Sequence, residues 1–90
     1  MKRIADIPEE IAGRLDLPAE TVAGVPKLTV TGRRRALIEN HRGLLQYSRD
    51  CIEVDGGRVR LRIRGANLQL VAMDRSDLLI SGVILSAEFE

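Results

Sequence analysis

The residues whose side chains could most readily carry out chemistry lie in one short stretch, Ile38 to Gly43 (IENHRG), which holds the only histidine of the chain. A glutamate, an asparagine and a histidine side by side could suggest a catalytic or metal-binding group. In an extended strand, however, adjacent side chains point to opposite faces, so these three cannot converge on one ion without a special turn. Asparagine and glycine are typical turn residues. The stretch therefore predicts a polar turn, with no catalytic or metal site.

Cys51 is the only cysteine, so it can form no internal disulfide and no CxxC motif. It could act as a nucleophile only if a base such as His41 came close, and no third residue that would orient this base is evident. A small buried apolar side chain is the simpler interpretation. Dinucleotide, P-loop, zinc-protease and serine-hydrolase motifs are missing. We therefore expect a protein that is not an enzyme and has no cofactor.

Arginine is the other residue type that could define a site, and it occurs in two clusters. The first consists of three consecutive residues, Arg33, Arg34 and Arg35. The second alternates with apolar residues and consists of Arg58, Arg60, Arg62 and Arg64. Alternation places this second set on one face of one strand, where it could attract phosphates, lipid headgroups or an acidic protein surface. Alternatively, these arginines pair with acids of neighbouring strands, such as Glu39, Glu53 or Asp74.

Composition narrows the range of partners. The 14 basic and 13 acidic residues leave a formal net charge of +1, which provides no bulk attraction to nucleic acid or to an anionic membrane. Tyr47 and Phe89 are the only aromatic residues, too few for a stacking platform or for a typical small-molecule pocket. We expect neither nucleic acid nor a small-molecule substrate. A lone cysteine and the lack of a signal peptide or an apolar run of ~18 residues indicate a cytoplasmic protein.

The elements that would position these residues change character along the chain. Residues 1–26 contain two helix-start signals, Asp6 before Pro8 and Asp16 before Pro18. From Lys27 onward the sequence alternates between apolar and polar residues, as strands do. We therefore expect a single domain, with an N-terminal helical segment over 1–26 and a β domain over 27–90.

The β part repeats itself. Residues 28–32, 61–65 and 78–82 each read apolar, any, β-branched, polar, glycine, and residues 45–49 follow the pattern loosely. Their first residues, Leu28, Leu45, Leu61 and Leu78, are 17, 16 and 17 positions apart. A second apolar run follows each first one, which predicts about eight short strands in a repeated strand-Gly-strand pattern. A tight bend needs positive φ or close backbone approach, so the structural corners should be Gly32, Gly65 and Gly82.

Two mainly β architectures fit this repeat. In a short β-solenoid the four units stack about 4.8 Å apart and their leucines form an internal ladder. In an antiparallel meander or small sandwich the units are successive hairpins. The sequence leaves both open, and in either one the four leucines should face a shared dry interior.

Several motifs in order resemble the YabP/YqfC family of sporulation proteins, and the YqfC branch most closely. They cover nearly the whole chain and comprise LDLP at 15–18, VPKLTVTG at 25–32, IENHRG at 38–43, YS at 47–48, LRIRG at 61–65 with Asn67 and Leu68, and ISGVI at 80–84. The resemblance implies a small protein of endospore-forming Firmicutes, made in the mother cell and needed for spore development. It also implies a membrane-protein partner of the YqfD type. It supplies no catalytic residue and no ligand.

Together these observations predict a non-enzymatic structural, assembly or partner-binding module in the mother-cell cytoplasm, near or at the forespore outer membrane. Short strands leave unpaired backbone edges, which could build a homo-oligomer or accept a strand from a partner. The alternative function is peripheral binding to an anionic membrane through the arginine-rich strand face.

Overall fold

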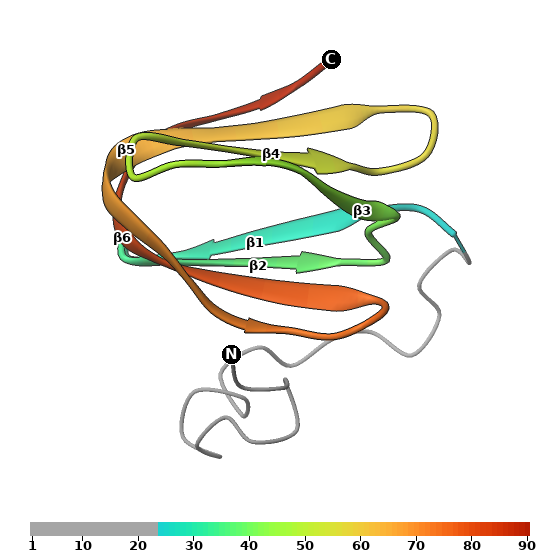
Figure 1. Ribbon diagram of the computed structural model, residues 1–90, viewed down its shortest axis with the longest axis horizontal. Coiled ribbons are helices and arrows are strands. Elements are labelled where there is room, and N and C mark those ends of the chain that lie inside the picture. The colour runs from blue at the N-terminus through green and yellow to red at the C-terminus, as the bar shows by residue number, and fades with distance from the viewer. Residues whose placement is uncertain (1–23) are drawn as a thin grey trace.

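The computed structural model describes residues 24–90, which form six β-strands and contain no helix. Figure 1 shows them in chain order: β1 (Lys27–Thr31), β2 (Arg35–Glu39), β3 (Gly43–Tyr47), β4 (Cys51–Asp55), β5 (Arg60–Met73) and β6 (Asp77–Phe89). The expectation of a mainly β protein is confirmed. The helical segment predicted over 1–26 falls almost wholly outside the described residues.

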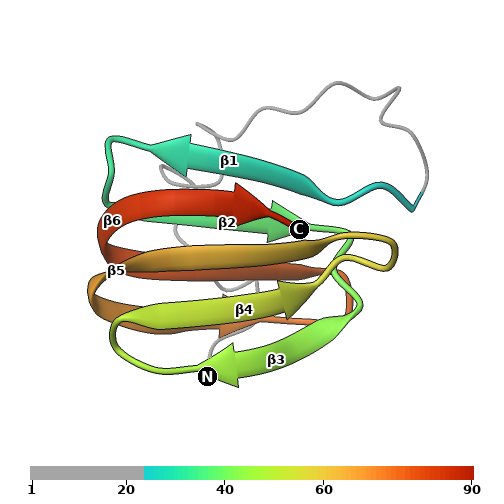
Figure 2. The same cartoon turned by 90° about the horizontal axis from the view of Figure 1, so that it is seen from above.

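The six strands form one sheet in the order β1-β2-β6-β5-β4-β3, and all neighbouring strands are antiparallel. β5 and β6 are long and bend midway, so the sheet folds over on itself (Figures 1 and 2). The β3–β4 half also contains the first part of β5 and the last part of β6. The β1–β2 half also contains the first part of β6 and the last part of β5. One sheet thus supplies two facing layers.

Two details of the sequence prediction are wrong. The strands number six and not about eight, because the last four apolar runs fuse in pairs into β5 and β6. A pattern of alternation does not distinguish a bend within one strand from a turn between two. The solenoid alternative also fails, because the coils of such a stack run in parallel whereas every strand pair here is antiparallel. The antiparallel alternative describes the observed sheet.

The core lies between the two halves and is almost entirely aliphatic. Both halves contribute to one cluster of buried residues: Ala36, Ile38, Ile52, Val54, Leu61, Ile63, Leu68, Leu78, Ile80 and Ile84. Two of the four leucines expected inside, Leu61 and Leu78, are fully buried, and Leu28 packs against the cluster. Leu45 is 52% exposed, so the expectation is wrong there. The pairing of β3 with β4 shifts next to Leu45, and Leu44 packs against the core instead.

The bend, at the end of the molecule where β5 and β6 turn from one half to the other, depends on two glycines. A Cβ atom on Gly65 would overlap the carbonyl oxygen of Val83. A Cβ atom on Gly82, which has φ +128°, would lie 2.6 Å from the carbonyl oxygen of Asn67. Only glycine allows the two paired strands to approach this closely where they bend.

Backbone hydrogen bonds from two hairpin turns secure the bend. The N–H groups of Gly65 and Leu68 donate to carbonyl oxygens of the β3–β4 turn, and that of Ile84 donates to Arg33 in the β1–β2 turn, over 2.8 to 3.1 Å. Gly32, the third predicted corner, lies in the β1–β2 turn itself. Gly32 and Arg33 both have positive φ, +56° and +61°, as a type I′ hairpin turn requires.

Candidate functional site

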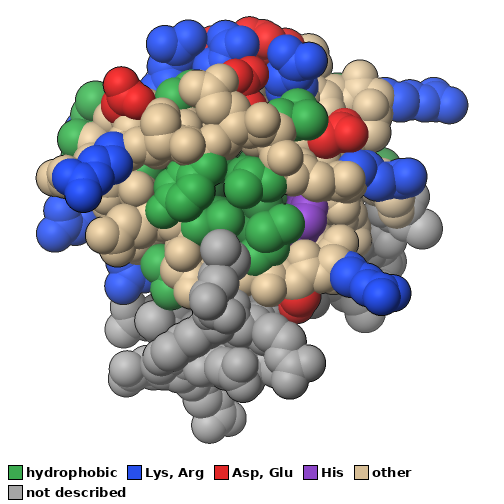
Figure 3. Space-filling model, in the orientation of Figure 1, with side chains coloured by type: hydrophobic (Ala, Val, Ile, Leu, Met, Phe, Trp, Pro, Cys, Tyr) green, Lys and Arg blue, Asp and Glu red, His purple; other side chains and the backbone are tan. Residues whose placement is uncertain are grey.

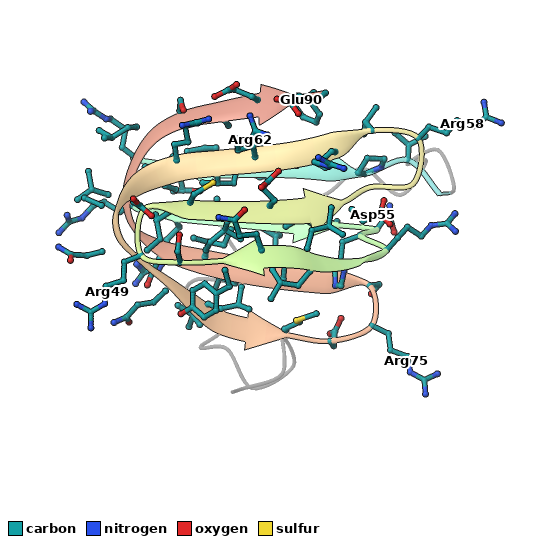
Figure 4. The ribbon with its side chains drawn as sticks, turned by 45° about the horizontal axis from the view of Figure 1, so that its top comes forward. Arg49, Asp55, Arg58, Arg62, Arg75 and Glu90 are labelled. Atoms are coloured by element: carbon teal, nitrogen blue, oxygen red, sulfur yellow. The ribbon has the colours of Figure 1, made fainter. Side chains whose placement is uncertain are left out.

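The arginine row of the sequence lies on the outer face of the β3–β4 half. Arg60, Arg62 and Arg64 point away from the core because they alternate with the buried Leu61 and Ile63. Figure 4 shows Arg62 beside Glu90 at the end of the chain. The sequence pattern therefore predicts this face correctly for three of its four arginines.

Acidic residues on both neighbouring strands pair with this row. Arg62 lies 2.7 Å from Glu90 and 3.2 Å from Glu53. Arg60 lies 3.8 Å from Glu53, and Arg64 lies 3.3 Å from Glu88. Glu53 is thus one of the partners that the sequence suggested, whereas Glu39 and Asp74 lie in the β1–β2 half.

The electrostatic state of the row follows from these pairs. The hydrogen bond to Glu53, joined by the charges of Glu90, Glu53 and Glu88, raises the pKa of Arg62 although partial desolvation opposes this. The guanidinium group therefore stays charged, and neighbouring carboxylates neutralise it. Exposed ion pairs of this kind contribute little to stability but leave a face of low net charge.

Arg58 is separate from the row. It lies in the turn between β4 and β5, and Figure 4 shows its side chain extending away from the sheet. Together with Arg42 and the backbone of Gly56 and Gly57, it lines an open hollow of about 540 Å³ next to Val25.

The other arginine cluster forms a positively charged tip, which we call the arginine tip (Arg33, Arg34 and Arg35). Arg33 and Arg34 are exposed in the β1–β2 turn, and Arg35 is half-buried at the start of β2. The Arg34 N–H closes the turn by donating to the Thr31 carbonyl oxygen over 3.1 Å. Within residues 24–90, none of the three arginines forms an ion pair. Among residues 24–90, the tip therefore gathers three positive charges without ion pairs, whereas the β5 face does not.

His41 lies at the end of the molecule opposite the bend and is buried, with 6% exposure. Its Nε2 donates to the carbonyl oxygen of Asp74 over 2.9 Å, and its backbone N–H donates to Ser76 over 2.9 Å. Asn40 has φ +63°, and its side chain donates to the Val25 carbonyl oxygen. The stretch is a turn, as the sequence indicates, but the histidine connects it to the β5–β6 turn. Nothing in a single sequence signals that burial.

The pKa values of the acidic residues around His41 are shifted in opposite directions. Glu39 and Asp77 lie directly opposite each other on β2 and β6. Burial raises the pKa of both, and the charge of a neighbouring carboxylate, Asp77 for Glu39 and Asp74 for Asp77, raises it further. Burial would also raise the pKa of Asp74, but hydrogen bonds from the Asp77 and Ser76 backbone and from the Ser76 hydroxyl lower it. Folding is therefore linked to protons in this corner.

Cys51 and His41 lie far apart. Cys51 is half-buried at the start of β4, opposite Arg64 and close to the bend. The residue after His41 donates its N–H to Asp55, the last residue of β4, over 2.7 Å. Cys51 and Asp55, the two ends of β4, are four residue steps apart, which corresponds to about 13 Å. Among residues 24–90, no three His, Cys, Asp or Glu side chains are grouped as metal ligands.

Exposed apolar side chains form a feature that the sequence does not reveal. Where the sheet folds, the outermost strands are β1 and the last part of β5 in one half, and β3 and the last part of β6 in the other. Large exposed apolar residues lie on three of these edges or directly before them: Val25, Val30, Leu45, Tyr47, Leu85 and Phe89. Figure 3 shows hydrophobic side chains gathered between the two halves on the face where β3 lies. Which strands become edges depends on topology, not on local pattern.

Comparison with known proteins places the chain in a family. Its sequence matches the YabP family over residues 23–90. The chain belongs to the YabP/YqfC family. It is 31% identical over 70 residues to the uncharacterized protein YqfC of Bacillus subtilis (strain 168), a match that covers 78% of this chain and 75% of that protein. No solved structure matches it. Membership of the YabP/YqfC family indicates a sporulation-related protein.

Proposed function

We propose that this protein is a non-enzymatic assembly module of spore formation, which acts through its strand edges by binding other protein chains. The observation that carries the proposal is the position of the exposed apolar side chains on edge strands. An unpaired strand edge offers backbone hydrogen bonds, and adjacent apolar side chains add affinity, as in known modes of strand addition.

The charges of the described residues favour a protein partner over a partner whose surface carries charge of one sign only. The arginine row on β5 is neutralised by Glu53, Glu88 and Glu90, so this outer face carries little net charge. The separation of Cys51 from His41 assigns both residues to structure in this proposal.

The cellular setting that we propose follows from the family. The module acts in the mother-cell cytoplasm, peripherally at the forespore outer membrane, with a membrane protein of the YqfD type as its partner. Residues 24–90 contain no helix at all, and hence none that could cross a membrane. Attachment through a membrane-protein partner would therefore require no spanning helix from these residues.

Co-purification from sporulating cells tests this function. A tagged chain isolated from detergent-solubilised membranes should bring the YqfD-type protein with it. Leu45→Ser and Leu85→Ser form a matched pair, because each removes an exposed leucine, 52% and 62% exposed, from a different edge. We expect at least one of the two to lower recovery of the partner. Equal recovery with both variants, or no membrane protein in the wild-type sample, would argue against partner binding through the edges.

The arginine tip favours a second candidate function, peripheral binding to anionic membranes. Three neighbouring arginines without ion pairs inside residues 24–90 could each interact with anionic headgroups. Flotation with vesicles containing anionic lipid tests it. Arg33→Gln with Arg34→Gln should abolish flotation, whereas Arg60→Gln with Arg64→Gln, an equal change of charge on the paired row, should not. Flotation that persists in high salt would exclude an electrostatic mechanism.

A further inference from the structure

The four strand edges of the folded sheet are not equally open. In the last part of β5, the Leu68 N–H donates to the Arg49 carbonyl oxygen and the Leu70 N–H donates to the Tyr47 hydroxyl oxygen. β3 is interrupted by the shift in register next to Leu45. The last part of β6 carries Glu88 and is followed by Glu90. Occupied backbone groups, bulges and charges are the common means of protecting an edge.

β1 is the least protected of the four edges among the described residues. Its five residues pair with β2 in unbroken register. Its one charge, Lys27, is at its first position, and the remaining four residues read Leu-Thr-Val-Thr. Outside its pairing with β2, its one backbone hydrogen bond within residues 24–90 closes the β1–β2 turn at Thr31. An exposed regular edge of this kind is a template for pairing with another strand.

The side chains of β1 indicate which strand would fit. Leu28 and Val30 lie opposite the buried Ile38 and Ala36 and so share the core face. Val30 is nevertheless 43% exposed, because β1 is the outermost strand of its half (Figure 2). An added strand with apolar residues on this face would extend the core outward and cover Val30.

We propose that β1 pairs antiparallel with β1 of a second copy, about a twofold axis at Thr29, to make a dimer with one continuous sheet. In this register Leu28 lies opposite Val30 of the partner copy and Val30 opposite its Leu28, so both cross-strand pairs on the core face are apolar. Lys27 lies opposite Thr31, and no like charges meet.

A symmetric pairing of this kind is closed. It uses the same edge of both copies, so no second β1 edge remains and assembly stops at two chains. The inference deepens the proposed function by naming one edge and its occupant, and it leaves the other edges available to the membrane-protein partner.

Light scattering coupled to size exclusion, over a range of protein concentrations, tests the dimer on the full chain. The wild type should approach twice the monomer mass as concentration rises and should not exceed it. Val30→Lys places a charge beside an apolar partner and should yield a monomer. Leu45→Lys is the control, because it places the same charge at a comparably exposed site on β3, and it should remain a dimer. Circular dichroism would establish that both variants are folded.

A disulfide test reports the register directly. In the Cys51→Ser background, Thr29→Cys would place two cysteines opposite each other at the axis, where antiparallel Cα atoms about 4.5 to 5.5 Å apart suit a disulfide. Mild oxidation should give a covalent dimer, whereas Leu45→Cys in the same background should not.

Three results would overturn the β1 dimer: a monomeric wild type at all concentrations, a Val30→Lys variant that is folded and still dimeric, or cross-linking through Leu45→Cys in place of Thr29→Cys. These measurements use purified protein alone. A monomeric protein that still co-purifies with the membrane protein would remove this inference and leave the proposed function intact. A dimer through β1 that brings no membrane protein with it would support this inference and argue against the proposed function.

Discussion

The two ends of the molecule hold the two halves of the sheet together by different means. At the bend, the contacts are made by the backbone. Gly65 and Gly82 let β5 and β6 approach where any side chain would collide, and carbonyl groups of two hairpin turns accept hydrogen bonds from these strands. At the opposite end, side chains add to the backbone hydrogen bonds of His41 and Arg42: the His41 ring lies between two turns, with the acids Glu39, Asp74 and Asp77 around it.

This difference predicts different sensitivities. Where two backbones leave no space for a methyl group, a larger residue destabilises the fold by steric overlap, and this effect does not depend on pH. A polar corner depends on protonation, so its contribution to stability should change with pH. The substitutions below test this contrast, in order of decreasing effect, and the stability measurements belong at low protein concentration, where the chain would be monomeric.

The largest effect should come from Gly65→Ala. The new methyl group would overlap the Val83 carbonyl oxygen, and the strands would have to separate. We expect a loss of about 3 kcal/mol or more in the free energy of unfolding, or failure to fold. Gly32→Ala is the matched control: φ is +56° there, but nothing lies within 4 Å of the added Cβ atom. Only backbone strain of about 1 kcal/mol should result. Urea denaturation measures the free energy of unfolding of both variants. Equal losses would show that the backbones of β5 and β6 are not tightly packed at Gly65.

His41→Ala should have the next largest effect. It removes the hydrogen bond to the Asp74 carbonyl oxygen and leaves a gap at a buried site. A loss of about 2 kcal/mol in the free energy of unfolding is expected from the unpaired oxygen and the lost packing. His41→Gln, which keeps an N–H donor, should recover part of it. If both variants are as stable as the wild type, the histidine does not link the two turns.

Glu39→Gln and Asp74→Asn should change the pH dependence of stability with opposite signs. The pKa of Glu39 is raised in the folded protein, so the wild type loses stability as pH rises from about 4.5 through that raised pKa. Glu39→Gln removes this loss and should be the more stable protein at neutral pH. The pKa of Asp74 is lowered, so its contribution is present above about 3.8 and is lost as pH falls further. Asp74→Asn should therefore be less stable than the wild type at neutral pH.

Thermal unfolding from pH 3 to pH 8 would measure these curves. Parallel curves for the wild type and both variants would mean that the corner does not couple folding to protons. Gly65→Ala, if it folds, should keep the wild-type dependence on pH, since it acts at the other end.

The smallest effect should come from Arg62→Gln on the outer face. Its partners Glu53 and Glu90 can be solvated once the arginine is gone, so the unfolding midpoint should move little, and less at high salt. Guanidinium denaturation would mask such charge effects, so urea is the suitable denaturant. A large loss of stability would show that the row supports the sheet and is not merely neutralised.

The sequence predicts local features of this fold well and its topology poorly. Alternation places Arg60, Arg62 and Arg64 on one face, and the steric role of glycine points to Gly65 and Gly82 as places where the chain turns sharply. Both inferences depend on a few neighbouring residues. The near-equal spacing of Leu28, Leu45, Leu61 and Leu78 suggests stacked units, but hairpins of similar length produce the same spacing, and only long-range pairing distinguishes them.

The candidate sites show the same limit. Charge pairing of the β5 row can be anticipated, because cross-strand acids are common on a wet face. The burial of His41 and the open edge of β1 depend on where Asp74 and the other strands lie, which no local pattern encodes. Leu45 illustrates a further case: one extra residue in β3 moves it to the surface and brings Leu44 against the core instead.

The central claim, one sheet folded over so that its halves share a core, can be tested by nuclear Overhauser effects between methyl groups. Ile38 on β2 and the pair Ile52 and Val54 on β4 belong to the same buried cluster. The folded sheet predicts cross-peaks between Ile38 and at least one of the β4 methyl groups. β2 and β4 are three positions apart in strand order, about 14 Å in a flat sheet, so such a sheet would show none. The absence of these cross-peaks in a protein whose strand pairs are otherwise as described would contradict the account.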